Sequence, residues 1–253
     1  MIFYEKYYST SGYINLVTIV NIAIFFNSIS ICLFCTMKIS IKDVIQRIRP
    51  FFIAYLILLC GCFIIKLLYS TDDIYFAVNT RHTDFLDTIE PYITDLGNGW
   101  TNIIIAAVIT LYNYRVAFLM VTTFLVTSSA VQLAKFFFDA PRPKLYFKDQ
   151  LSKLHFVKGV DILSNHSFPS GHTLTAFATG VLITYLVKNK SWWILLLFYG
   201  IMVGFSRMYL SQHFFEDVIG GSVMGVFLSI FWIGWIDSRP FMNSPGWNRG
   251  LLR

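Results

Sequence analysis

The chain has little charge for its size. Of 253 residues, 13% are Asp, Glu, Lys or Arg, whereas 56% are hydrophobic and 18% are aromatic. A soluble globular protein carries about 25% charged residues. The shortage of charge excludes an ordinary water-soluble enzyme, and the abundance of large apolar side chains excludes a disordered or collagen-like chain. A polytopic membrane protein remains.

Cysteine is also scarce, and its four copies all lie within apolar runs, at Cys32, Cys35, Cys60 and Cys62. Cys32 and Cys35 have the spacing of a C-x-x-C redox or zinc motif, but no second Cys or His pair lies near them. We interpret all four as small hydrophobic side chains. The N-terminus lacks the basic start and the small-residue cleavage site of a secretory signal peptide.

Long apolar runs are present instead. A membrane-spanning helix needs about 20 apolar residues, and seven candidate segments predict an all-α, polytopic transmembrane helical bundle. The pair of glycine motifs at Gly200–Gly204 and Gly221–Gly225 predicts close helix packing. We expect 99–135 to form a helical hairpin that turns at Asn113–Arg115. The candidate spans are 14–37, 50–69, 99–113, 116–135, 171–187, 192–210 and 216–236.

Two long polar segments lie on the same side of the membrane if all seven segments span it. Residues 70–98 hold six acidic residues against one basic residue, and residues 136–170 hold one arginine and four lysines. The acidic pair Asp72–Asp73 is expected in a solvated loop. The four lysines are expected to be solvated or to contact anionic lipid.

The net charge of +6 could suggest a nucleic-acid partner in a soluble protein. In a membrane protein, basic residues more directly indicate which loops face the cytoplasm. Ten basic residues, Arg115 among them, fall opposite the long polar segments and nine fall beside them; setting aside Lys135, Arg142 and Arg207 leaves ten against six. By the positive-inside rule the ten face the cytoplasm. The long segments then lie outside. The compact size and the short tails suggest a bacterial inner-membrane protein, with the long segments on its periplasmic or outer face.

Three charged clusters stand out because charge beside a membrane span is costly unless it has a function or a partner. The first is K-x6-R-P at the end of the fourth span, and the second is P-S-G-H at the start of the fifth. The third, S-R-x5-H-x3-D, bridges the last two spans. They contribute Lys135 and Arg142; Ser170, Gly171 and His172; and Arg207, His213 and Asp217.

These residue types suit an anion site with a nucleophile. Lysine and arginine side chains bind phosphate oxygens, arginine in bidentate geometry, and a helix start at Ser170–Gly171 offers free backbone N–H groups. His213 and Asp217 are four residues apart and are expected on one helix face. The carboxylate then orients one imidazole nitrogen and leaves the other as a nucleophile. Any one such residue is more often a snorkelling anchor or a structural histidine; the ordered combination is what carries the prediction.

With these motifs the sequence resembles the type 2 phosphatidic-acid phosphatase family, which shares its phosphate site with vanadium-dependent haloperoxidases. The resemblance covers about residues 50–236. It implies a six-helix core, so that 1–49 is an N-terminal segment with an extra span (14–37), 50–236 is the phosphatase core and 237–253 is a cytoplasmic tail. It also implies a site on the non-cytoplasmic face and a phosphorylated membrane lipid as substrate.

For individual residues, the resemblance implies that His213 attacks phosphorus and forms a phosphohistidine, that Asp217 orients it, and that His172 protonates the leaving group. It implies that Lys135, Arg142, Ser170, Gly171 and Arg207 bind the phosphoryl oxygens, and that no metal or other cofactor is needed. The motifs themselves also indicate that no metal is needed. They contain one carboxylate, Asp217, whereas a two-metal phosphatase needs several clustered ligands. His155 and His166 are expected to be surface residues or to line the substrate entrance.

Alternatives stay open at this point. The same phosphohistidine would serve a lipid phosphotransferase, and a chain with a vestigial site would be a lipid-binding protein. No partner is predicted beyond the bilayer and a lipid substrate. The sequence defines neither which lipid is the substrate nor the oligomeric state of the protein.

Overall fold

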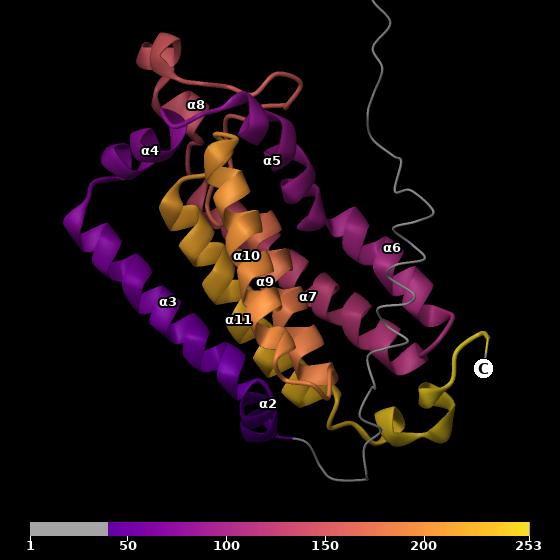
Figure 1. Ribbon diagram of the computed structural model, residues 1–253. Coiled ribbons are helices and arrows are strands. Elements are labelled where there is room, and N and C mark those ends of the chain that lie inside the picture. Colours follow the sequence, from indigo (N-terminus) through magenta and orange to yellow (C-terminus); the bar gives the residue numbers. More distant parts are fainter. Residues whose placement is uncertain (1–39, 253) are drawn as a thin grey trace, which may run out of the picture.

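The computed structural model describes residues 40–252, so the expected extra span 14–37 lies outside the described residues. Within that range the chain is a helical bundle without β-strands (Figure 1). The helices are α2 (Ile41–Arg47), α3 (Arg49–Leu68), α4 (Thr71–Asn79), α5 (Asp84–Leu96), α6 (Gly99–Thr110), α7 (Tyr114–Phe138), α8 (Pro143–Tyr146), η1 (Lys148–Lys153), α9 (Gly171–Leu186), α10 (Trp192–Tyr209), α11 (Phe215–Ile236), η2 (Pro240–Asn243) and η3 (Pro245–Asn248).

Four of these helical stretches are long and apolar enough to cross a membrane: α3, Tyr114–Tyr146, α10 and α11. α6 is apolar but has 12 residues, and α9 has 16, most of them buried. The expected hairpin forms, since α6 packs along α7. The Asn113 side chain begins α7 by accepting a hydrogen bond of 3.0 Å from the Val116 amide. An asparagine at this position satisfies one of the free amides of a helix start.

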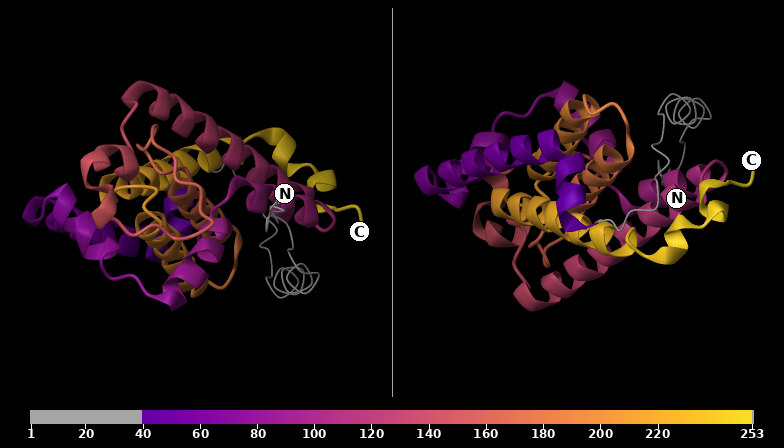
Figure 2. Two further views of the ribbon diagram at one scale, coloured as in Figure 1. Left: turned by 90° about the horizontal axis from the view of Figure 1, so that it is seen from above. Right: turned by 90° about the horizontal axis from the view of Figure 1, so that it is seen from below.

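The centre of the bundle is α9, which packs against α7, α10 and α11 (Figures 1 and 2). The Gly221–Gly225 motif lets α11 touch α9, because a Cβ at either glycine would overlap the backbone of Ser170 or Leu174. The glycine prediction is confirmed here. It matters for the site, because it fixes the start of α9 against the first turns of α11.

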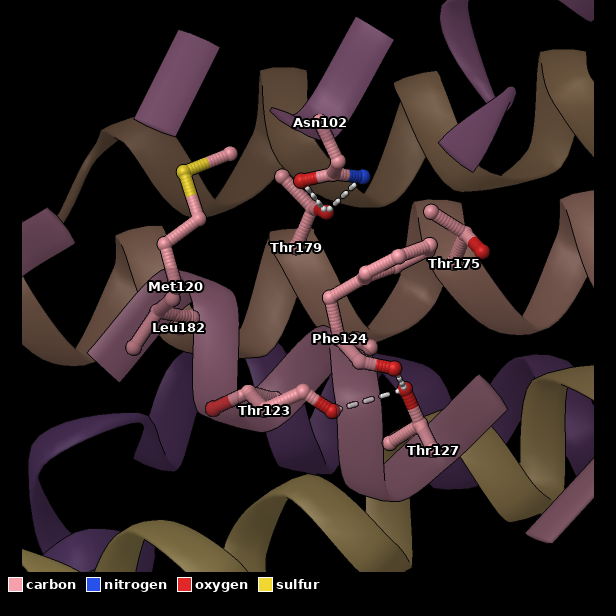
Figure 3. A pocket seen from close by; sticks show the side chains of 9 residues that line it. Asn102, Met120, Thr123, Phe124, Thr127, Thr175, Thr179 and Leu182 are labelled. Carbon is pink, nitrogen blue, oxygen red and sulfur yellow. Dashed lines mark hydrogen bonds between the residues drawn. The ribbon is translucent and has the colours of Figure 1, made fainter. Parts of the chain in front are cut away.

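A polar seam crosses this apolar core between α6, α7 and α9 (Figure 3). Asn102 and Thr179 hydrogen-bond each other at 3.1 and 3.2 Å, and the Thr127 hydroxyl donates to the Thr123 carbonyl at 2.8 Å. A buried amide is costly without such partners. The seam therefore joins the hairpin to α9.

The two polar segments lie at one end of the bundle, where α7 ends and α9 begins, as the sequence predicts (Figure 1). The expectation of a solvated loop at Asp72–Asp73 is wrong about the loop, although Asp73 is exposed. Both residues lie in the first turn of α4, where Asp73 and Ser70 form a reciprocal capping box. Acidic side chains favour a helix N-terminus because they complement its partial positive charge.

The opposite end holds a buried ion pair. Arg115, counted above among the basic residues opposite the long polar segments, is 5% exposed and donates three hydrogen bonds to Asp237, at 2.7, 2.7 and 3.1 Å. Arg115 does lie at the end opposite the long polar segments, but its charge is paired with a carboxylate that follows α11, 122 residues away. Beyond Asp237 the chain packs back on the α6–α7 turn, where the Tyr114 amide donates to the Arg249 carbonyl at 2.8 Å (Figure 2).

Candidate active site

The three charged motifs meet at the end of the bundle that carries α4, α5 and α8. Lys135 lies in the last turns of α7, Arg142 precedes α8, and Arg207 lies in the last turn of α10. The start of α9 approaches the first of these, since a Cβ built on Gly171 would lie 4.0 Å from Lys135 Nζ. The start also touches α11, because the Ser170 amide donates to the Asp217 carbonyl at 2.9 Å.

His213 and Asp217 are in contact, but not in the way the spacing predicts. His213 precedes α11, whose N-cap is Phe214, and only Asp217 lies on the helix. Asp217 Oδ2 accepts the Phe214 amide at 2.8 Å and lies 3.4 Å from His213 Nδ1. The shared helix face is therefore wrong, whereas the pairing of the imidazole with the carboxylate is present.

Ser167 is a further member of this cluster that sequence reasoning missed. It is fully buried, and its hydroxyl donates to Asp217 Oδ2 at 2.5 Å and lies 3.5 Å from His213 Nδ1. Its amide donates to the Ala140 carbonyl at 2.9 Å. Ser167 thus links the segments of all three motifs. A serine three residues before a helix start carries no sequence signal of its own.

Arg142 is held by backbone and amide oxygens. Its Nε donates to the Asn165 carbonyl at 2.9 Å, and its Nη1 donates to the carbonyl and side-chain oxygens of Gln212, at 3.0 and 2.9 Å. The Arg142 amide also donates to the Ser164 carbonyl at 2.8 Å. These acceptors orient the guanidinium without neutralising it. Gln212, next to His213, is a second residue that the motifs did not single out.

Arg207 is 7% exposed and is reached from α5, where the Thr94 hydroxyl accepts from its Nη1 at 2.7 Å. The Nε of Arg207 is buried without a partner among residues 40–252. In the same range, none of the ion pairs involves Lys135, Arg142 or Arg207. Three cations thus converge on a buried site without a carboxylate bridge, an arrangement that favours an anionic ligand.

The start of α9 adds amide donors to this site. Ser170 is the N-cap, and its hydroxyl is hydrogen-bonded to the Thr173 hydroxyl at 2.9 Å rather than to a helix amide. The first amides of a helix have no partner within the helix. Apart from the neighbouring residues of its own helix turn, the nearest described atom to a Cβ built on Gly171 is Lys135 Nζ, at 4.0 Å. Amides at a helix start beside a lysine form a phosphate cradle.

His213 is poised as a neutral base. Burial lowers the pKa of His213 well below its usual value, and the charges of Arg207, Arg142 and Lys135 lower it further. A neutral imidazole carries a proton on one ring nitrogen and a free lone pair on the other. With Nδ1 facing Asp217 and Ser167, the free lone pair is placed on Nε2.

Two further histidines were expected at the surface or at the substrate entrance. His155 pairs with Asp87 at 2.9 Å and stacks on His82. His166 is exposed and lies beside the site, 3.1 Å from Asp139 and 3.4 Å from the Lys135 carbonyl. The four lysines of the outer segment, Lys144, Lys148, Lys153 and Lys158, are exposed as expected. Between residues 40 and 252 no three His, Cys, Asp or Glu side chains are grouped to hold a metal ion.

Glu90, one turn before Thr94 on α5, is a residue that neither the motifs nor the contacts explain. It is fully buried, and neither carboxyl oxygen has a partner in the described part of the chain. Burial raises the pKa of Glu90 from 4.5 to about 7. A neutral carboxylic acid is therefore the form that this packing favours at mildly acidic pH.

Comparisons with known proteins agree with this geometry. The undecaprenyl-diphosphatase of Sulfolobus acidocaldarius is 34% identical over 88 residues, which cover 33% of this chain and 42% of the relative. The lipid A 1-phosphatase of Porphyromonas gingivalis is 31% identical over 90 residues, or 35% of this chain and 20% of the relative. The matched stretches thus span less than half of these curated relatives.

A solved structure covers more of the chain. The transmembrane PAP2-type phosphatidylglycerolphosphate phosphatase of Bacillus subtilis is 26% identical, with a TM-score of 0.54 over 76% of this chain and 96% of its own. The sequence pattern that defines the PAP2 superfamily matches residues 104–240, which include every predicted site residue. The chain belongs to the PAP2 superfamily, as its three motifs predict.

Proposed function

We propose that the protein is a membrane lipid phosphatase that hydrolyses a phosphomonoester or pyrophosphate lipid through a phosphohistidine at His213, without a metal. One observation carries the proposal: Lys135, Arg142 and Arg207 lie around the His213–Asp217 pair, and within residues 40–252 no carboxylate forms an ion pair with any of the three. A phosphoryl group supplies the missing negative charge.

In the first step, His213 Nε2 attacks the phosphorus atom of the bound lipid. The P–N bond forms as the bond from phosphorus to the lipid oxygen breaks. His172 follows Gly171 in the first turn of α9, beside Lys135, and gives a proton to the departing lipid oxygen. Asp217 and Ser167 hold the Nδ1 side of the imidazole, which becomes positive while it carries the phosphoryl group.

In the second step, water attacks the phosphorus, gives a proton to His172 and breaks the P–N bond. Inorganic phosphate leaves and both histidines return to their starting states. The oxygens of the transferring group are bound by the three cations, the Ser170 hydroxyl and the Gly171 amide. Fixed donors aimed at developing charge are commonly the largest contribution to such catalysis.

Three lipids are suggested by the relatives' names: undecaprenyl diphosphate, lipid A 1-phosphate and phosphatidylglycerophosphate. Phosphatidic acid is a fourth candidate from the family resemblance. We place the site on the non-cytoplasmic face. Removing the buried Arg115 from the topology count leaves nine basic residues at the opposite end against six, so the positive-inside argument still favours this orientation.

The test is phosphate release from the four lipids by the full chain in detergent with EDTA, beside His213→Gln. We expect release by the wild type, none above background by the variant, and an acid-labile phosphohistidine in the wild type alone. Equal release by both proteins would overturn the mechanism. Transfer of labelled phosphate to an added lipid, instead of to water, would make the enzyme a phosphotransferase, and binding without turnover would make it a lipid-binding protein.

A further inference from the structure

The helix α5 lies outside residues 104–240, the stretch that matches the PAP2 superfamily, and yet it reaches the candidate active site. It packs along α10 at the end of the bundle where the three motifs meet (Figure 1). Two hydrogen bonds fix it there. The Tyr209 hydroxyl donates to the Asp87 carboxylate, and the Tyr199 hydroxyl donates to the Leu96 carbonyl at 2.7 Å. α5 is therefore held against α10 over most of its length.

The face of α5 that meets α10 carries polar and small residues. Glu90, Thr94 and Gly97 recur every three or four residues, so they share one side of the helix, and all three are buried. A Cβ built on Gly97 would lie 2.5 Å from Val203 Cγ1 and 2.9 Å from the His172 carbonyl oxygen. The glycine thus lets the end of α5 approach both α9 and α10, one turn after Thr94.

Thr94 holds one nitrogen of a site arginine. Its hydroxyl accepts a hydrogen bond from Arg207 Nη1 at 2.7 Å, and the two residues are 8% and 7% exposed. The neighbouring Asp95 is exposed, and it belongs to none of the ion pairs within residues 40–252. The contact from α5 is therefore neutral, so it orients the guanidinium without cancelling its charge.

The edge of the Arg207 guanidinium that carries Nε and Nη2 is left for a ligand. Arginine binds an oxyanion most strongly through two N–H groups of one edge. In this chain Arg115 binds Asp237 through its Nε at 3.1 Å and its Nη2 at 2.7 Å. In Arg207 the Nε is buried without a partner in the described part of the chain. The protein thus contacts Nη1 and leaves open the edge that binds a carboxylate elsewhere in the same molecule.

Arg207 is also tied to the proposed nucleophile. The Gln212 and His213 amides both donate to the Arg207 carbonyl, at 3.0 and 3.2 Å. Burial lowers the pKa of His213, and among the charges around the imidazole that of Arg207 lowers it most. The guanidinium therefore lies close enough to His213 to act on a phosphoryl group bound there.

We propose that Thr94 is a positioning residue, which holds Arg207 Nη1 so that Nε and Nη2 face two oxygens of the phosphoryl group. This inference rests on the proposed function and adds to it a helix that the three motifs do not include. Thr94 does not touch the lipid and acts through Arg207. Without the hydroxyl, the guanidinium turns toward another acceptor and its two-point contact with phosphate is lost.

The first test compares Thr94→Val, which keeps the shape of threonine without its acceptor, with Thr94→Ser, which keeps the hydroxyl. Per folded molecule, we expect kcat/KM for the hydrolysed lipid to fall about tenfold in Thr94→Val and to stay within about twofold in Thr94→Ser. Thr184→Val is the matched control and should keep wild-type activity, because Thr184 is fully buried in the last turn of α9 and bonds the Gly180 carbonyl of its own helix. Equal activity in the two Thr94 variants would overturn the role.

A double-mutant cycle separates positioning from a general loss of packing. In an Arg207→Ala background, Thr94→Val should change kcat/KM by less than about twofold, because no guanidinium is left to hold. Additive losses would overturn the proposal, since they would show that Thr94 acts by another route. If valine at this buried position prevents folding, Thr94→Ala takes its place in both comparisons, with the same outcomes expected.

Binding of inorganic phosphate gives a readout that needs no hydrolysis. Isothermal titration of the full chain in detergent is expected to give a dissociation constant about fivefold higher for Thr94→Val than for the wild type or Thr94→Ser. Unchanged affinity in Thr94→Val would overturn the positioning of Arg207. If the wild type released no phosphate from any lipid and the difference in affinity still held, the proposed function would fail while the role of Thr94 at an anion site would stand.

Discussion

Both ends of the bundle bury arginine, and they treat its charge in opposite ways. At the end with the C-terminus, Arg115 is bonded to both oxygens of Asp237, whose Oδ2 also accepts the Tyr185 hydroxyl at 2.6 Å. Tyr185 in turn accepts from Arg47 at 3.2 Å. At the other end, Arg142 and Arg207 contact only neutral oxygens, and one guanidinium nitrogen has no partner in the described chain.

This difference separates structure from function. A buried charge is tolerated when it is paired, and its pairing contributes mainly to holding elements together. A group of buried cations without counter-charge reduces stability unless a ligand supplies the charge. The end with the Arg115–Asp237 ion pair, called the paired end below, holds α2, α7, α9 and α11 together. The end with Arg142 and Arg207, called the unpaired end, is expected to bind phosphate.

The largest expected effect is loss of stability at the paired end. Arg115→Met leaves Asp237 buried without its cation, which costs about 3–5 kcal/mol. The melting temperature measured in detergent should fall accordingly. Per folded molecule, the rate of phosphate release should stay within about twofold of the wild-type rate. The double variant Arg115→Met/Asp237→Leu should recover most of the loss. A single variant as stable as the wild type would break the comparison.

The matching change at the unpaired end is Arg207→Ala. We expect kcat/KM for the hydrolysed lipid to fall by about 10²–10³, or roughly 3–4 kcal/mol of transition-state stabilisation, with a melting temperature that is unchanged or higher. Steady-state kinetics and thermal unfolding check both halves. If Arg207→Ala instead unfolds as Arg115→Met does, Arg207 is a structural residue.

The pH dependence of stability tests whether Glu90, on α5, is buried without a partner. Its pKa is about 7 in the folded protein against 4.5 as the ordinary value, so the folded state prefers the neutral acid. The stability that this preference contributes is complete below about pH 4.5 and is lost as pH rises through 7. Glu90→Gln should thus be neutral at pH 4.5 and stabilising at pH 8, by at most about 3 kcal/mol. The same difference at both pH values would contradict burial of an unpartnered carboxyl.

The smallest effect is expected at Ser167, whose hydroxyl donates a hydrogen bond to the Asp217 carboxylate of the candidate active site. Ser167→Ala removes a donor to Asp217, and we expect kcat to fall about tenfold, or about 1.4 kcal/mol, with KM unchanged and slower formation of the phosphohistidine. Ser229→Ala is the matched control, since Ser229 is equally buried and its hydroxyl has no partner in residues 40–252. Ser167→Thr keeps the hydroxyl and should retain more activity than Ser167→Ala. Equal kcat in the two alanine variants would remove Ser167 from the mechanism.

Much of the fold is readable from the sequence because membrane spans are local features. Apolar runs of the required length predict α3, α7, α10 and α11, and the turn at Asn113 predicts the α6–α7 hairpin. The helices α4 and α5 are not predicted, because their short, acidic sequences resemble loops. Their helical form depends on caps at Ser70 and Thr83 and on packing against α10.

Only part of the candidate site can likewise be predicted from the sequence. Its titratable residues are recognisable by type, spacing and order, since scarce charge beside a span is conspicuous. Thr94, Ser167 and Gln212 are not recognisable, because neutral polar residues are common and their partners lie 46 to 113 residues away. The ion pair of Arg115 is missed for the same reason, because Asp237 is remote in sequence.

By itself, the sequence determined that this protein is a helical membrane protein with three cations, two histidines and one carboxylate available for phosphate chemistry. Only the tertiary structure decided which buried arginines are neutralised and which are left for a ligand. Composition and spacing define which side chains exist, but the free energy of a buried charge depends on what packing places within hydrogen-bond distance of it.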